Sequence, residues 1–193
     1  RRKAESTKKK SKHNGHYDTP KELGKKWQMD VKYVPSACYA GEDGEKFYQY
    51  TMLEEASRKR FIYAYRETGG YSTCDFVKRA IIWFGYAPDI IQTDNGGEFT
   101  HTKKTKRIHP FDSLCAELHI THKLIRPRTP WHNGKVERSH RNDQERFYNH
   151  LSFYSYEDLQ IQMKRYLYRS NNIPMAVLGW KSPNQKQREM ETA

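Results

Sequence analysis

Two aspartates occupy positions from which a carboxylate commonly does chemistry. Asp30 stands in the middle of residues 27–34, where alternating apolar side chains predict a strand with one buried face, although aspartate is disfavoured in strands. Asp94 follows residues 89–93, a short apolar run that predicts a buried strand, and a Gly-Gly pair behind it allows a tight turn. Ligands gather at the carboxyl ends of strands in α/β sheets, so Asp94 is a candidate site residue. The simpler interpretation of Asp30 is a polar side chain that faces solvent.

A third acid lies in the stretch R-T-P-W-H-N-G-K-V-E-R-S-H-R, residues 128–141. Pro130 and the Asn-Gly pair after it predict an irregular first half, whereas nothing breaks a helix in the second half. Glu137 therefore stands in the first turn of a predicted helix, and Arg141 is its neighbour four residues further on. The simpler interpretation is an exposed helix whose glutamate favours the N-terminal dipole and pairs with an arginine.

Together the three acids predict a metal site. If the first and fourth strands are neighbours, Asp30 and Asp94 meet, and Glu137 completes the cluster from a helix packed beside them. Carboxylates this close repel one another unless a cation is present. Ligation by oxygen alone suits Mg²⁺, with Mn²⁺ as a substitute. Two such ions about 4 Å apart activate an attacking hydroxyl and stabilise the leaving oxygen of a phosphodiester.

The hydrophobic periodicities predict a mixed α/β sheet with helices on both faces. The predicted strands are residues 27–34, 47–53, 61–65, 89–93 and 120–125, and the predicted helices are residues 73–84, 110–118, one from 135 and one that Ser155 caps. The polar residues from Lys181 onward predict a frayed end.

Composition favours an anionic partner. The 193 residues contain 35 Lys and Arg against 23 Asp and Glu, a formal net charge of +12, for which nucleic acid is the default partner. No apolar run is long enough for a membrane span. The three cysteines are far apart and form no C-x-x-C pair, which predicts free thiols in a reducing compartment.

The chain divides into three predicted parts. Residues 1–22 are a basic flexible linker that either contacts phosphates or only connects, residues 23–175 are the folded core, and residues 176–193 are a C-terminal extension. The chain does not begin with methionine, which favours a fragment with another domain upstream.

Three stretches resemble the acidic motifs of the DDE transposase and retroviral integrase superfamily, and the likeness is greatest to bacterial insertion-sequence transposases. They are W-Q-M-D-V at 27–31, T-D-N-G-G-E-F at 93–99 and P-W-H-N-G-K-V-E-R-S-H-R at 130–141. G-W-K-S-P at 179–183 is similar to a proline motif that often closes this core. One motif is weak, but three in order on matching elements are specific.

This resemblance implies a ribonuclease-H-like fold with a mixed five-stranded sheet flanked by helices. It also implies two Mg²⁺ ions held by Asp30, Asp94 and Glu137, cleavage at transposon ends, and strand transfer to target DNA by the freed 3′-hydroxyl. A homodimer or higher oligomer follows from the need to join two ends to a target. The expected location is cytoplasmic and nucleoid-associated in a bacterium, or nuclear in a eukaryote.

Two features depart from the family pattern. The gap of 42 residues between Asp94 and Glu137 is longer than usual, and the basic loop 101–109 accommodates the surplus. Gln144 stands seven residues after Glu137, where many insertion-sequence enzymes have a Lys or Arg. The terminal phosphate is therefore assigned to Arg141 or Arg138. The full set of predicted DNA contacts is Lys103, Lys104, Lys106, Arg107, Trp131, Asn133, Lys135, Arg138 and Arg141.

Several alternatives remain open from sequence. Glu98 is a rival ligand to Asp94, and Trp131 either stacks on an unpaired base or wedges the loop against the core. The spacing of Cys115, His119 and His122 is compatible with zinc, but a fourth ligand is missing. Two other functions are a ribonuclease-H-type nuclease that acts on RNA·DNA hybrids and a catalytically silent DNA-binding relic of the same fold.

Overall fold

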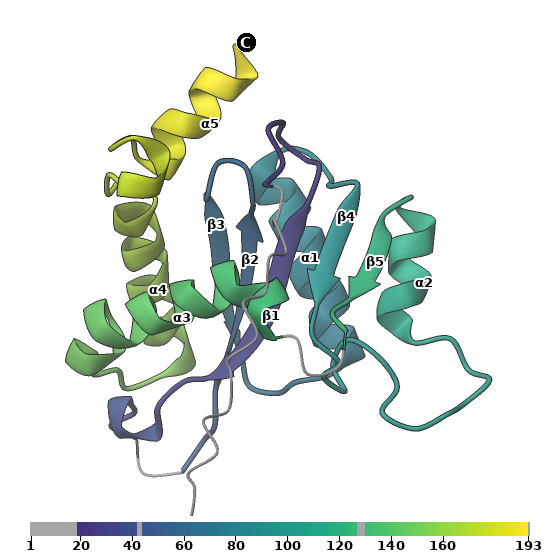
Figure 1. The fold of residues 1–193 in the computed structure, drawn as a ribbon. Coiled ribbons are helices and arrows are strands. Elements are labelled where there is room, and N and C mark those ends of the chain that lie inside the picture. The colour runs from purple at the N-terminus through teal and green to yellow at the C-terminus, as the bar shows by residue number, and fades with distance from the viewer. Residues whose placement is uncertain (1–18, 42–43, 127–129, 193) are drawn as a thin grey trace, which may run out of the picture.

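The computed structural model describes residues 19–41, 44–126 and 130–192, and its centre is a five-stranded sheet (Figure 1). Three antiparallel strands come first in the chain, β1 (Trp27–Tyr33), β2 (Tyr48–Glu54) and β3 (Arg60–Tyr65). The strands β4 (Ile90–Thr93) and β5 (Thr121–Leu124) extend the sheet in parallel on the other side of β1, so that the order is β3-β2-β1-β4-β5. The predicted mixed sheet is confirmed.

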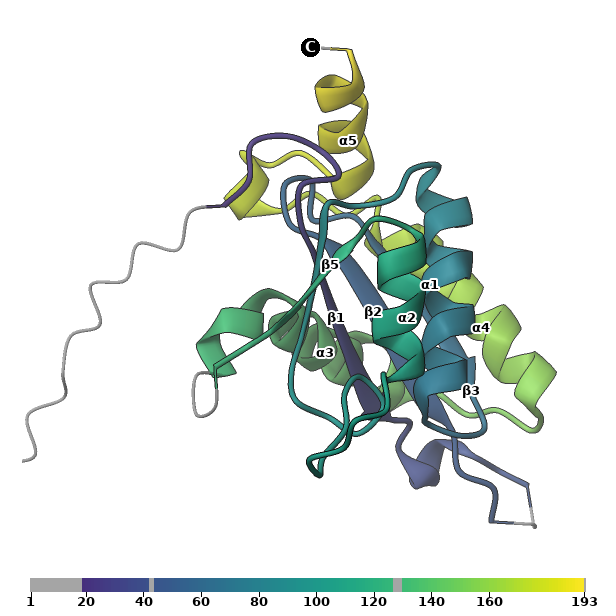
Figure 2. The ribbon, with the colours of Figure 1, turned by 90° about the vertical axis from the view of Figure 1, so that its right-hand side faces the viewer.

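Helices lie on both sides of this sheet. The helices α1 (Gly70–Phe84) and α2 (Pro110–Glu117) cover one face, and α3 (Gly134–Arg146) crosses the other (Figure 2). The helix α4 (Tyr156–Ser170) packs along β3, and α5 (Pro183–Glu191) follows near the C-terminus. Among the described helices, none combines the length and the apolar character that a bilayer crossing requires.

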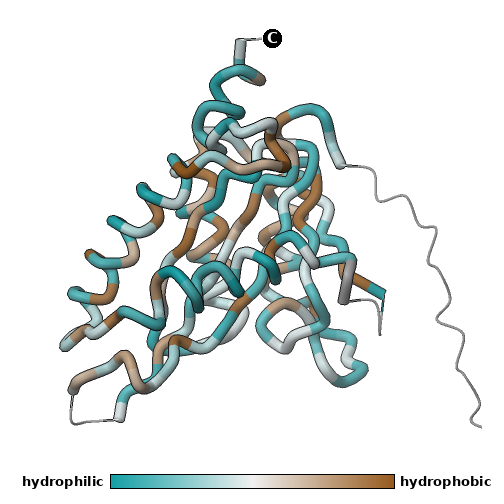
Figure 3. The backbone as a smooth tube through the Cα atoms, turned by 60° about the vertical axis from the view of Figure 1, so that its left-hand side comes forward, coloured by the Kyte–Doolittle hydropathy of each residue, from teal (hydrophilic) through white to brown (hydrophobic). Residues whose placement is uncertain are grey.

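The core forms mainly between the sheet and α1. The predicted apolar stripe of α1 is buried as Phe76, Val77, Ala80 and Phe84, and the helix ends at Gly85 with a left-handed φ of 85°. Each large apolar side chain buried in this way contributes about 1.5–3 kcal/mol. Figure 3 shows the hydrophobic colour concentrated in the strands, whereas α3 is hydrophilic along most of its length. A helix this polar is therefore held to the sheet by hydrogen bonds and ion pairs as well as by apolar contact.

The structure differs from the sequence-based predictions at the first strand and at the C-terminal residues. The strand β1 was expected to bury one face, but Gln28 is as fully buried as its neighbours because α3 covers the second face, while Tyr33 is 68% exposed. Residues from Lys181 onward are not a frayed end. They form α5, whose Ser182 and Gln185 make a reciprocal capping box that supplies partners for the first N–H groups of the helix.

Candidate active site

Asp30 and Asp94 stand on adjacent strands at the same level. In the parallel pairing of β1 and β4, Gln28 is opposite Gln92, and the same register two residues further brings Asp30 level with Asp94. Neighbouring strands lie about 4.8 Å apart, so the two backbones are close at this point. The predicted adjacency of the first and fourth strands is confirmed.

The carboxylate of Asp30 is oriented by two donors. Its Oδ1 accepts a hydrogen bond from the backbone N–H of Val31 at 2.9 Å, and its Oδ2 lies 3.3 Å from Nδ1 of His140 on α3. The other ring nitrogen of His140 is 3.0 Å from the hydroxyl of Thr51 on β2. His140 thus connects α3 to the strand that carries Asp30 and to the next strand. The sequence motif contained His140, but nothing in its spacing indicated this contact.

The loop after β4 holds Asp94 in place. Its Oδ1 accepts a hydrogen bond from the backbone N–H of Gly96 at 2.9 Å, and the hydroxyl of Thr93 donates to its carbonyl oxygen. A Cβ atom at Gly96 would lie 2.8 Å from the carboxylate of Glu98, so glycine leaves room for a second acid beside the first. Glu98 belongs to the loop, as predicted.

Glu137 lies in the first turn of α3, on a segment fixed by side-chain amides. Pro130–Asn133 is a single 3-10 turn, not the irregular stretch that was predicted. Gln28 accepts a hydrogen bond from the N–H of Val136 at 3.1 Å, and both Gln28 and Gln92 donate to the carbonyl of His132.

Asn133 donates through Nδ2 to the carbonyl of Met29 at 3.2 Å, which ties the same turn to β1. These amides satisfy backbone groups at a helix start that is pressed against the sheet. Sequence reasoning missed the two glutamines because their role depends on the pairing of strands.

A buried ion cluster lies behind this segment. Glu55 is fully buried after β2, with Lys26 at 3.2 Å and Lys135 at 2.5 Å. Burial lowers the pKa of Lys135, and the charge of Glu55 opposes that shift. Lys135 was predicted as a DNA contact, and its ammonium group in this structure is bound to an internal carboxylate.

A second buried cluster holds the far half of α3. Asp143 is fully buried, with Nη1 of Arg60 at 2.6 Å, Nε2 of Gln49 at 2.8 Å and the hydroxyl of Tyr166 at 2.9 Å. Nη1 of Arg60 makes no well-angled hydrogen bond, so this contact is an ion pair defined by distance. The pKa of Asp143 is raised by burial, but Arg60 and Gln49 outweigh that effect and the net shift is downward. The carboxylate therefore stays charged inside the protein.

The candidate acids share an electrostatic field. Burial raises the pKa of Asp94, and the charge of Asp30 raises it further. The pKa of Glu137 is raised by burial, then by Asp30 and Asp94, while His140 lowers it. The pKa of Glu98 is likewise raised, first by burial and then by the charges of Asp94 and Asp30. The negative charge of Asp30 thus contributes, after burial, to the raised pKa of Asp94, Glu98 and Glu137.

The carboxylates of Asp30, Asp94 and Glu137 are ligand types that suit a hard divalent cation. The donors are carboxylate oxygens, and no Lys or Arg forms an ion pair with Asp30, Asp94 or Glu137 within the described residues. Across that same part of the chain, no three acid, histidine or cysteine side chains already stand close enough to coordinate one ion. Coordination of one ion by all three acids would therefore require side-chain movement.

The predicted DNA-contacting residues divide into three groups. Lys103, Lys104, Lys106 and Arg107 are exposed on the loop between β4 and α2, and Arg138 and Arg141 are exposed on α3. Asn133 is only 1% exposed and supports the turn, and Lys135 is paired as described above. The side chain of Trp131 and residues 1–18 of the predicted basic linker 1–22 lie outside the described residues.

The residues of the alternative zinc interpretation have other surroundings. Cys115 is buried in the core, and burial raises the pKa of its thiol to about 12. His122 lies between Asp112 at 2.6 Å and the hydroxyl of Thr93 at 2.9 Å. All three cysteines are free thiols, as predicted.

The strand order and the helices on both faces define a ribonuclease-H-like fold. The sequence pattern of the integrase core domain family matches residues 20–130, and a second integrase core pattern matches residues 118–183. The chain belongs to the integrase core domain family, within the DDE transposase and retroviral integrase superfamily.

A curated relative agrees with this assignment. The chain is 30% identical over 157 residues to "Putative integrase ORF3" of Spiroplasma virus SpV1-C74, a match that covers 75% of this chain and 42% of that protein. The chain thus spans less than half the length of this curated relative.

Solved structures share the fold at lower identity. The simian T-cell lymphotropic virus intasome in complex with PP2A regulatory subunit B56 gamma has a TM-score of 0.66 at 18% identity, over 89% of this chain and 56% of that one. The HTLV-2 integrase catalytic core domain in complex with magnesium has a TM-score of 0.58 at 20% identity, over 85% and 96%. The catalytic core domain of BIV integrase has a TM-score of 0.63 at 20% identity, over 88% and 97%.

Proposed function

We propose that this chain is the catalytic core of a transposase or integrase that cleaves DNA ends and transfers the freed strand to a target by metal-dependent phosphoryl transfer. The observation that carries the proposal is the strand register that sets Asp30 level with Asp94 on a family core, with no Lys or Arg in the described residues paired to these acids or to Glu137. Burial raises the pKa of Asp94 and of Glu137, and the charge of Asp30 raises both further. Shifted pKa values of this kind cluster at functional sites.

Asp30, Asp94 and Glu137 would hold two Mg²⁺ ions, for which Mn²⁺ substitutes. The HTLV-2 integrase catalytic core domain, solved in complex with magnesium, supports a divalent ion in this fold. When bound, such ions polarise the phosphodiester and lower the pKa of an attacking hydroxyl.

The chain's own residues orient that site. His140 and the N–H of Val31 set the Asp30 carboxylate, and the N–H of Gly96 sets that of Asp94. The amide hydrogen bonds of Gln28 hold the turn before α3 and so fix the backbone from which Glu137 extends. Because these carboxylates are already oriented, less reorganisation of the protein is needed at the reacting phosphate.

The substrate is proposed to be DNA, both transposon ends and target. The exposed lysines and arginine of the loop 103–107, together with Arg138 and Arg141, supply phosphate contacts, and the net charge of +12 agrees with a polyanion. Joining two ends to one target implies a dimer or higher oligomer. The intasome among the structural neighbours supports a DNA-associated assembly.

The decisive test is strand cleavage by purified protein on an end-labelled duplex in Mg²⁺ and in EDTA. Asp30→Asn is expected to abolish cleavage and leave the circular dichroism spectrum unchanged. The matched control is Asp89→Asn, which makes the same change at an exposed site before β4 and should cleave like the wild type. Full activity of Asp30→Asn would refute the assignment.

Two rival functions are separated by the same assay. A silent DNA-binding relic would bind the duplex and nick nothing in any divalent ion. A ribonuclease-H-type nuclease would cut an RNA·DNA hybrid in preference to the duplex end. The intact set of three acids favours an active enzyme over the relic.

A further inference from the structure

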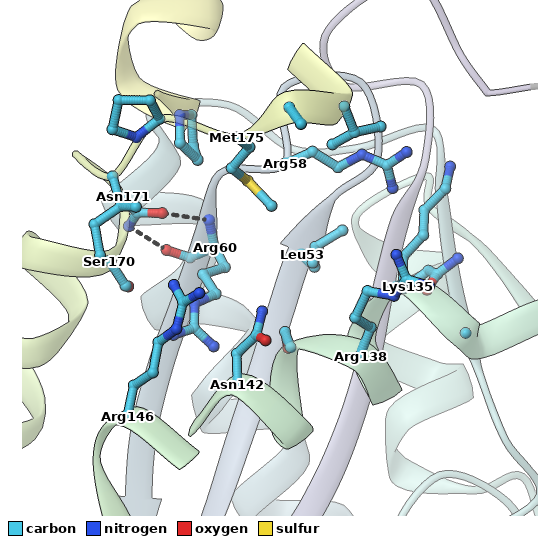
Figure 4. A pocket seen from close by; sticks show the side chains of 18 of the residues that line it. Leu53, Arg58, Arg60, Lys135, Arg138, Asn142, Arg146, Ser170, Asn171 and Met175 are labelled. Carbon is cyan, nitrogen blue, oxygen red and sulfur yellow. Dashed lines mark hydrogen bonds between the residues drawn. The ribbon is translucent and has the colours of Figure 1, made fainter. Parts of the chain in front are cut away.

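The flank of α3 that faces away from the acids forms one wall of a cleft of about 610 Å³ (Figure 4). Arg138, Asn142 and Arg146 rise from α3, and Met175 and Arg58 face them from the opposite side. The floor is the sheet, through Leu53 of β2 and Gln28 of β1. None of these residues is a candidate metal ligand.

The cleft is strongly cationic. The described residues that line it include five Lys or Arg side chains and no Asp or Glu. Arg60 is paired with Asp143 and Lys135 with Glu55, but Arg138 and Arg146 have no ion-pair or hydrogen-bond partner in the part of the chain that the structure describes. Eight residues of helix separate these two arginines, or about 12 Å along the axis, which is long enough for more than one phosphate of a strand.

The wall opposite α3 is apolar and firmly held. It contains Pro174, Met175 and Val177 from the segment between α4 and α5. Asn171 anchors this segment through two hydrogen bonds to the backbone of Arg60, at 3.1 and 2.9 Å (dashed in Figure 4). The cleft is therefore a preformed space between fixed elements.

We infer that this cleft binds a short single-stranded stretch of the DNA substrate, with phosphates on Arg138 and Arg146 and a base against the apolar wall around Met175. This inference rests on the proposed function and extends it to an unpaired strand. A volume of this size suits one or two nucleotides and is too small for a duplex. A positive groove beside an apolar surface is the usual design of a single-strand site.

The location connects the cleft to the acids. Gln28 lines the cleft and precedes Asp30 by two residues on β1, and Arg138 follows Glu137 on α3. A strand that passes the acids can therefore continue over the start of α3 into the cleft, which places the unpaired nucleotides beside the cleavage site.

The test measures binding of a fluorescein-labelled single-stranded oligonucleotide by anisotropy in EDTA, where no cleavage occurs. The double variant Arg138→Gln/Arg146→Gln is expected to weaken binding at least tenfold at 100 mM salt, and to lower the salt slope by about 1.4, since each phosphate contact contributes about 0.7 on a single strand. Asn142→Glu, which adds a negative charge inside the cleft, should weaken binding to a similar degree. The matched control is the double variant Arg165→Gln/Arg169→Gln on the exposed side of α4, where the same loss of two charges should change little.

Three results would overturn the inference. The first is a loss no greater than that of Arg165→Gln/Arg169→Gln, and the second is an equal or greater loss on the blunt duplex of the same sequence. The third is displacement of the oligonucleotide by polyglutamate of equal charge as effectively as by unlabelled strand, which would indicate an acidic-peptide surface. Because binding is measured without metal, selective loss in the double variant together with absent nicking would uphold the cleft and reject the proposed function.

Discussion

Replacing Arg60 by Met would remove the only cation paired with the fully buried carboxylate of Asp143 among the described residues. Gln49 and Tyr166 would still donate hydrogen bonds, but the charge would be left without a counter-ion. Breaking one partner of a buried ion pair costs about 3–5 kcal/mol. A domain is stable by about 5–15 kcal/mol, so Arg60→Met should lose a large fraction of its free energy of unfolding.

The loss should depend on pH in a defined direction. In the wild type the folded-state pKa of Asp143 is depressed, so its contribution is present above the unfolded-state pKa and is lost as the pH falls through the folded value. Without Arg60 the remaining effect of burial raises this pKa, and protonation then favours the folded state. The difference in free energy of unfolding between wild type and Arg60→Met should therefore be smaller at pH 5 than at pH 7.5.

The assay is urea unfolding followed by tryptophan fluorescence at both pH values. The double variant Arg60→Met/Asp143→Leu removes both charges and should recover part of the loss, because an apolar replacement of a buried pair is often neutral. A loss below about 1 kcal/mol for Arg60→Met, or a double variant as unstable as the sum of the two single variants, would refute the reasoning.

Three further predictions concern the loop, the metal and the last helix. Gln28→Leu removes the donors and acceptor that hold His132 and Val136, and should cost about 1–3 kcal/mol and slow strand cleavage at least tenfold; a wild-type cleavage rate would contradict the positioning role. Because the pKa values of Asp94 and Glu137 are raised in the folded state, the metal-free protein loses stability as the pH rises through those values. The increase in Tm caused by Mg²⁺ should therefore be larger at pH 7.5 than at pH 5. The increase should be absent in Asp30→Asn. Ser182→Ala removes the capping box of α5 and should cost about 1 kcal/mol, visible as faster amide exchange in that helix alone; unchanged exchange would show that the cap is unimportant.

Local patterns in the sequence predicted the helices and strands and indicated the candidate acids. Alternation located β1 to β3, the apolar stripe and Gly85 located α1, and Ser155 with its acidic followers located the start of α4. Asp30 could be singled out because aspartate is disfavoured in a strand, and such conflicts concentrate at functional sites. Asp94 and Glu137 were singled out by their places at a strand end and in the first turn of a helix, within the three motifs. Five strands and a mixed sheet followed from these patterns. The pairing of β1 with β4, which sets Asp30 beside Asp94, was only a condition of the metal-site prediction until the structure showed it.

What the sequence could not provide depends on contacts between residues far apart in the chain. Gln28, Glu55 and Asp143 are ordinary polar residues in any local window, and only the packing of α3 against β1 and β2 buries them and gives them partners. The same packing turned Lys135 inward and left Arg138 and Arg146 facing a cleft whose other wall comes from residues 173–177. Burial and pairing are properties of the assembled fold, because a charge is costly or available only according to what lies beside it, and that is decided when the elements meet.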